Sequence, residues 1–155
     1  VTEKENPSII SEISYQNPTY THQGWFDDDQ RFFILGDELD ESRIGGKTRT
    51  LIFDLSDLDK PSVHHTYYGP TEAIDHNGYI KEDLFYLANY TAGVRVIAID
   101  GLASKKMNEI GFFDTFPEHN STTFNGAWNV YPFFDSGVIA ISDINRGLFL
   151  IKKSE

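Results

Sequence analysis

Three apolar runs along this chain each end, after one small residue, in a polar turn residue. These turn residues are Asp37, Asn89 and Asp143, at intervals of 52 and 54 residues. A spacing of roughly 50 residues between short strands is typical of β-propeller blades. The repeat therefore predicts an all-β, propeller-like fold and argues against helical or doubly wound architectures.

Short runs rich in β-branched and aromatic residues, bounded by turn residues, predict the individual strands. In the middle repeat the alternation of apolar runs and turns is clearest, and Gly93 supplies the positive φ that a tight turn needs. The predicted strands cover residues 31–36, 48–54, 63–68, 83–88, 94–100, 109–116, 137–142 and 148–152.

These strands group into about three four-stranded antiparallel blades at 21–70, 71–120 and 121–155, the last without its outer strand. Residues 6–15 resemble 60–68, so we expect 1–20 to carry the outer strand of a preceding or closing blade. Propellers usually have four to eight blades. We therefore expect a larger ring, completed either by more of a longer chain or by a second copy.

The composition excludes several classes of partner. The formal net charge of −11 disfavours binding to nucleic acid and to anionic membrane surfaces. The absence of cysteine excludes disulfides and thiolate metal sites. No run of apolar residues is long enough for a transmembrane helix.

Two histidines, His22 and His76, occupy equivalent places in the first two repeats, whereas the third repeat offers Asn125 or Trp128 there. One interpretation is a metal or ligand site on the inner rim of the propeller. The alternative is that each histidine hydrogen-bonds nearby backbone where its blade begins. Nucleophile elbows, phosphate-binding glycine loops and zinc helix motifs are all absent from the sequence.

The first repeat carries an acidic insertion that the other two lack. It contains Asp37, Glu38, Asp40 and Glu41 and ends in two glycines. Hard oxygen ligands in a loop suit Ca²⁺, so these four residues are candidate calcium ligands. The alternative is a solvated loop whose charge aids solubility.

The turn residues of the repeat also have a structural interpretation that needs no ligand. Asn and Asp tolerate positive φ and bond their own turn backbone. We therefore expect this local role for Asp37, Asn89 and Asp143.

Several longer segments resemble choice-of-anchor B family proteins, which carry LVIVD-type repeats. The resemblance rests on residues 22–25, 36–41, 48–54, 90–100, 126–132, 135–137 and 142–150. It implies an exported β-propeller, larger than this chain, that is tethered at the cell surface. It implies no catalytic residues.

The repeat and the resemblance together predict a non-enzymatic binding or scaffold module with a protein or glycan ligand, outside the cell, at its surface or in the periplasm. Calcium is the one cofactor that the acidic insertion suggests. The alternative is a metal-dependent hydrolase or lyase whose site lies in the propeller channel, lined by His22, His76 and nearby carboxylates.

Overall fold

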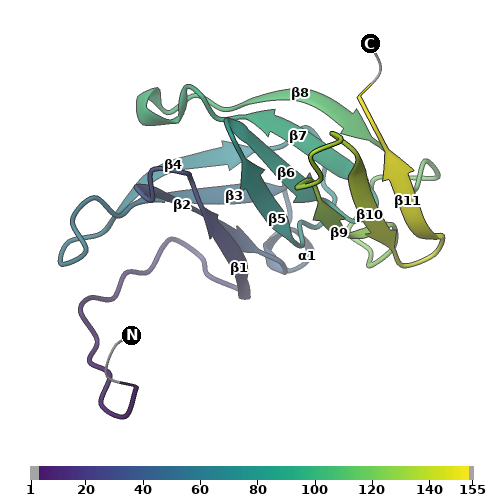
Figure 1. Ribbon diagram of the computed structural model, residues 1–155. Coiled ribbons are helices and arrows are strands. Elements are labelled where there is room, and N and C mark those ends of the chain that lie inside the picture. The colour runs from purple at the N-terminus through teal and green to yellow at the C-terminus, as the bar shows by residue number, and fades with distance from the viewer. Residues whose placement is uncertain (1–3, 154–155) are drawn as a thin grey trace.

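The computed structural model describes residues 4–153, and its chain forms three antiparallel sheets, one for each repeat (Figure 1). The first sheet contains β1 (Thr21–Phe26), β2 (Phe32–Asp37), β3 (Arg49–Asp54) and β4 (Ser62–Tyr68), in that order. The second contains β5 (Gly78–Lys81), β6 (Leu84–Ala88), β7 (Val94–Ala98) and β8 (Asn108–Phe113). The third contains β9 (Ala127–Tyr131), β10 (Ile139–Asp143) and β11 (Gly147–Ile151).

Helical structure is limited to a short helix α1 (Asp40–Arg43), between β2 and β3, and a 3₁₀ turn η1 (Leu102–Ser104), between β7 and β8. Within residues 4–153, no helix is both long and apolar enough to cross a membrane.

The predicted all-β class is confirmed, and the three sheets are consistent with propeller blades, although the described residues close no ring. Strand ends differ from the prediction by a few residues. β7 ends at Ala98 because the chain then turns into η1, and β8 ends at Phe113 because the Asp114 carboxylate accepts a hydrogen bond from the Phe116 N–H.

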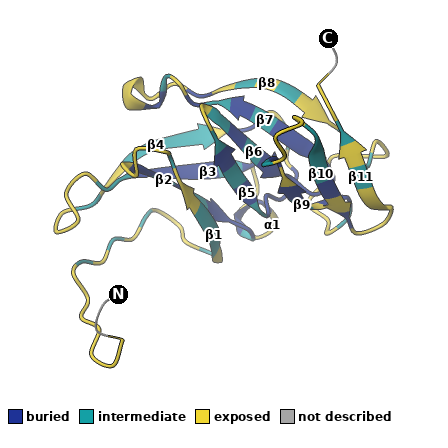
Figure 2. Ribbon diagram, viewed as in Figure 1, coloured by how far each residue is buried: buried dark blue, intermediate teal, exposed yellow. Residues whose placement is uncertain are grey.

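The second sheet is covered on both faces, and this places the core (Figure 2). On β6, Phe85 and Leu87 pack toward the first sheet, whereas Tyr86 and Ala88 pack toward the third. This is the period-2 alternation of a strand that separates two apolar layers. The innermost strand of the second sheet, β5, contacts both β1 of the first sheet and β9 of the third. The first strands of the three sheets therefore lie side by side.

The segment before β1 forms no strand in residues 4–20, where an outer blade strand was expected. It runs along the first sheet instead, with the Tyr15 ring edge-on against Phe53 and the Ser11 hydroxyl donating to the Leu58 carbonyl. A closing strand needs the edge of another blade as its partner, and this segment does not pair with the open edge strand β11 of the third sheet. The closing strand therefore stays a prediction.

The three turn residues of the repeat play different roles, contrary to the single role expected. Positive φ occurs at Tyr90 and Gly93, one and four residues after Asn89, and at none of the three turn residues. Only Asp143 bonds its own turn, through the N–H groups of Asn145 and Arg146. The chain leaves each strand in a different direction, so the side chains of Asp37, Asn89 and Asp143 have different hydrogen-bonding groups within reach.

Asn89 connects its strand to a distant segment of the chain. Its side-chain nitrogen donates to the carbonyls of Ala73 and Ile74, at 3.0 and 2.8 Å, and to the Thr48 hydroxyl. Asn89 is buried, so water does not compete for these bonds. The amide thus fixes the linker between the first two sheets.

Substituting Asn89→Ala is expected to lower the free energy of unfolding by about 2–3 kcal/mol, because the Ile74 carbonyl loses its donor and the Ala73 carbonyl keeps only the Thr48 hydroxyl. Urea denaturation followed by circular dichroism measures this loss. Asn120→Ala, at an exposed position, is the matched control and should change stability by less than about 0.5 kcal/mol. Equal effects of the two substitutions would contradict the role given to Asn89.

Candidate metal centre

Three rings at equivalent places in the repeats stack where the inner strands begin. The centroid of the His76 ring lies 4.5 Å from that of His22 and 4.1 Å from that of Trp128. The β1–β2 ladder shifts register at His22, and the β9–β10 ladder shifts at Trp128. A β-bulge turns a side chain out of the normal alternation. The two bulges thus bring His22 and Trp128 onto His76.

The two histidines share one carboxylate. His22 Nδ1 lies 3.4 Å from Glu38 Oε2, and His76 Nε2 lies 3.8 Å from Glu38 Oε1. One ligand atom from each of the three residues lies within 4.8 Å of the others. Two imidazoles and one carboxylate form a donor set typical of Zn²⁺ and of other divalent transition metals.

Glu38 is held in place by its own backbone and by Tyr90. Its N–H donates to the Tyr20 carbonyl, and its Oε1 accepts a hydrogen bond of 2.6 Å from the Tyr90 hydroxyl. Burial, together with this bond to Glu38, raises the pKa of Tyr90, so the phenol stays a donor. Glu38 Oε2 is left facing His22.

The tautomer of His76 follows from its neighbours. Its Nδ1 lies 2.5 Å from the Trp128 carbonyl oxygen, which only accepts, so Nδ1 carries the proton. Burial lowers the pKa of His76, against the opposing effects of this carbonyl and of Glu38, and favours the neutral ring. A lone pair on Nε2 then faces the Glu38 carboxylate with no proton between them.

A histidine that donates through one ring nitrogen to a backbone carbonyl, and offers the other nitrogen, has the arrangement usual for metal ligands. Both interpretations of the paired histidines thus describe His76, which bonds backbone with Nδ1 and faces the carboxylate with Nε2.

The four candidate calcium ligands of the acidic insertion do not share one site. Glu38 joins the two histidines, whereas Asp40 and Glu41, on α1, lie beside Asp75 from the linker between β4 and β5. Glu38, Asp40 and Glu41 are all buried, so the alternative of a solvated loop does not describe them.

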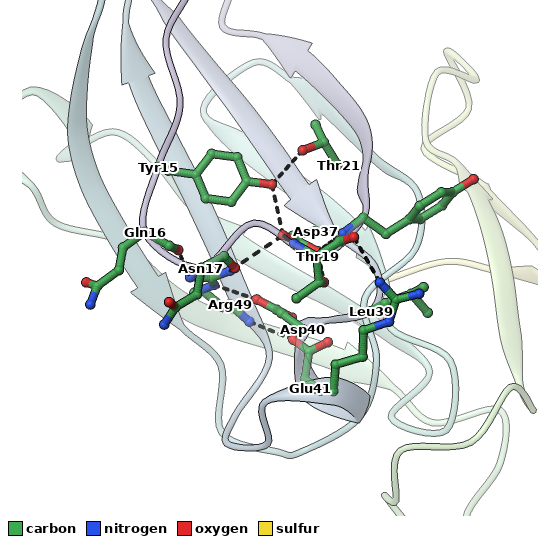
Figure 3. Close-up of polar contacts among 12 residues, drawn as sticks. Tyr15, Gln16, Asn17, Thr19, Thr21, Asp37, Leu39, Asp40, Glu41 and Arg49 are labelled. Carbon is green, nitrogen blue, oxygen red and sulfur yellow. Dashed lines mark hydrogen bonds and ion pairs between the residues drawn. The ribbon is translucent and has the colours of Figure 1, made fainter.

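Asp37 belongs to neither cluster and bonds the segment before β1 instead (Figure 3). It accepts hydrogen bonds from the Thr19 and Tyr20 N–H groups and from the hydroxyls of Thr19 and Tyr15. Burial opposes its ionisation, but these bonds outweigh burial and lower the pKa of Asp37. Its role is therefore to fasten residues 15–20 to the first sheet.

Sequence reasoning missed Asp75 and Tyr90 as neighbours of the candidate site, whereas Trp128 was one of the two residues expected at the equivalent place in the third repeat. Asp75 directly precedes His76, and this acid–histidine pair was the one available signal. Trp128 reaches the site because the third sheet packs against the second, and Tyr90 reaches it because the second repeat packs against Glu38 of the first.

Comparison with protein-family models and with curated proteins found no match for this chain. The geometry of the fold and of the site therefore carries the argument about function.

Substituting Asp37→Ala is expected to cost about 3 kcal/mol of unfolding free energy, because it leaves two partly buried N–H groups without an acceptor and removes one of the two carboxylates beside Arg49. Limited proteolysis should also cut residues 4–20 faster. Asp143→Ala is the matched control, at the equivalent place in the repeat, and should cost only about 1 kcal/mol. Unchanged proteolysis in the Asp37 variant would show that this carboxylate does not hold the segment.

Proposed function

We propose that this chain is a metal-binding module of a larger β-propeller, with one divalent transition metal held by His22, Glu38 and His76. The module forms three blades, and the metal lies where their inner strands converge. There it joins β1 and the end of β2 in the first blade to the residues just before β5 in the second.

The single observation that carries the proposal is the contact between His76 and Glu38. The buried Nε2 lone pair and the carboxylate oxygen are 3.8 Å apart, and both bear negative electrostatic potential. With the ring neutral, this contact is unfavourable unless a proton or a metal ion brings positive charge between the two groups. A metal ion provides that positive charge and at the same time takes a bond from His22.

Exposed apolar side chains support the proposed larger ring. Leu148 and Leu150, on the open edge strand β11, are 68% and 65% exposed. Uncovered apolar residues on an edge strand are a liability that a neighbouring blade removes. Further blades of a longer chain, or a second copy of this one, would cover them.

The resemblance to choice-of-anchor B family proteins supports an exported, cell-surface setting for this propeller. In that setting the metal serves structure, and loops at the blade ends bind a protein or glycan ligand. The module is then a non-enzymatic binding or scaffold unit.

A metal-dependent hydrolase or lyase is the second candidate function, and the exposure of His22 favours it. The His22 side chain remains 25% exposed, so the site is reachable from solvent on that side. Three protein ligands leave coordination positions for water or substrate, as in catalytic zinc sites.

Calorimetric titration of the chelator-treated chain with Zn²⁺ is expected to show a site that depends on these three residues. His22→Ala and Glu38→Gln should each weaken Zn²⁺ binding by at least about tenfold, since each removes a ligand. Replacing the Zn²⁺ with Co²⁺ should give visible absorption that the same variants lose.

His119→Ala is the matched control, because His119 is exposed, its ring packs edge-on against Phe116 and its Nδ1 is hydrogen-bonded to the Ser121 hydroxyl. It should leave Zn²⁺ binding unchanged. Equal Zn²⁺ affinity in all four proteins would overturn the proposal. Hydrolysis of a test ester that needs the metal and is lost in His22→Ala would favour the second candidate over the scaffold.

A further inference from the structure

A second group of acidic side chains meets beside the candidate metal centre, without histidine. Asp40 and Glu41 come from α1, and Asp75 comes from the linker before β5. One carboxylate oxygen from each lies within 4.8 Å of the other two, and all three side chains are buried. The cluster thus joins the acidic insertion of the first repeat to the second repeat.

Some of these oxygens are occupied by Arg49 (Figure 3). Its Nε lies 2.5 Å from Asp40 Oδ2, and its backbone N–H donates to Glu41 Oε1. The second oxygens, Asp40 Oδ1 and Glu41 Oε2, are buried and accept no hydrogen bond.

Asp75 is the most demanding member of the cluster. It is 1% exposed, and within residues 4–153 neither of its carboxylate oxygens accepts a hydrogen bond from another residue. A buried carboxylate without hydrogen bonds or a counter-charge is strongly unfavourable. Asp75 therefore needs a positive partner that the neighbouring side chains do not supply.

Gly36 makes room for this carboxylate. A Cβ atom at position 36 would lie 2.4 Å from Asp75 Oδ2, so any side chain there would push the carboxylate away. The first sheet thus accepts Asp75 against its backbone, and the carboxylate stays in the cluster.

Repulsion within the cluster has a clear consequence for protonation. Burial, followed by the charges of Asp40, Asp37 and Glu38, raises the pKa of Asp75. Burial and the charge of Asp75 raise the pKa of Glu41 to about 10. Three buried carboxylates this close together, with oxygens that lack hydrogen-bond partners, need positive charge, as bound protons or as a bound cation.

We infer that Asp40, Glu41 and Asp75 bind one Ca²⁺ ion, at a site separate from the His22–Glu38–His76 centre. The donors are oxygens only, which suits a hard cation. The three oxygens lie within 4.8 Å of one another, close enough for one Ca²⁺ ion to contact all of them at about 2.4 Å. Mg²⁺ dehydrates reluctantly and usually keeps several waters, so a buried cluster favours Ca²⁺ over Mg²⁺.

The test measures Ca²⁺ binding to the full chain after removal of divalent ions with a chelator. Calorimetry and the melting temperature report binding, and Tb³⁺ luminescence excited through tyrosine reports it independently of stability. Ca²⁺ should bind and raise the melting temperature. Asp75→Asn should weaken binding at least about tenfold and abolish the stabilisation, because it removes the unpaired carboxylate.

Asp59→Asn, at an exposed position, is the matched control and should bind Ca²⁺ like the unmodified chain. Glu41→Gln serves as the second variant if Asp75→Asn does not fold, and it should lose binding too. No binding at millimolar Ca²⁺, or equal binding in the cluster variants and Asp59→Asn, would overturn the inference and leave protons as the positive charge.

The tests of the two proposed sites can be told apart by their variants. His22→Ala removes a ligand of the transition-metal centre only, so it should weaken Zn²⁺ binding and leave Ca²⁺ binding intact. Loss of Ca²⁺ binding in His22→Ala together with retention in Asp75→Asn would contradict the calcium site, whatever the outcome of the Zn²⁺ titration.

Discussion

The burial of negative charge between the first two sheets is the constraint on which this end of the molecule depends. Five carboxylates are buried there, on Asp37, Glu38, Asp40, Glu41 and Asp75. Arg49 is the cation that contacts them directly, through Asp40 and more distantly through Asp37. One guanidinium does not balance five buried carboxylates. Each remaining negative charge therefore needs hydrogen-bond donors, a proton or another cation.

The structure solves the problem differently for each part of the acidic run. Asp37 accepts hydrogen bonds from several donors of the segment before β1, and these bonds stabilise its negative charge. Glu38 receives a phenol hydrogen bond and faces two imidazoles. Among the described residues, Asp40 Oδ1, Glu41 Oε2 and both Asp75 oxygens have no hydrogen-bond donor. Asp37, which has donors, is therefore a structural carboxylate, whereas Asp40, Glu41 and Asp75 are candidate cation ligands.

Sequence patterns predicted β2–β4, β6–β8, β10 and β11 because alternation and turn residues are local signals, whereas the inner strands β1, β5 and β9 received no predicted bounds. They did not predict that Glu38 joins one cluster while Asp40 and Glu41 join another. That division depends on α1, which turns Asp40 and Glu41 away from Glu38 within three residues. Asp75 was equally hidden, because only the packing of the linker against Gly36 brings it to the insertion. The pairing of His22 with His76 did follow from their equivalent places in the repeat.

The second repeat shows how the same structural task is done without charge. Where the first repeat places Asp37 and its acidic insertion, the second places Asn89, whose neutral amide satisfies two linker carbonyls. Neutral hydrogen bonding avoids the desolvation cost of a buried ion. A chain that needed only to fasten its sheets together could use that solution twice. The first repeat instead keeps buried carboxylates with free oxygens directed at one another and at histidine, the arrangement that a cation site requires.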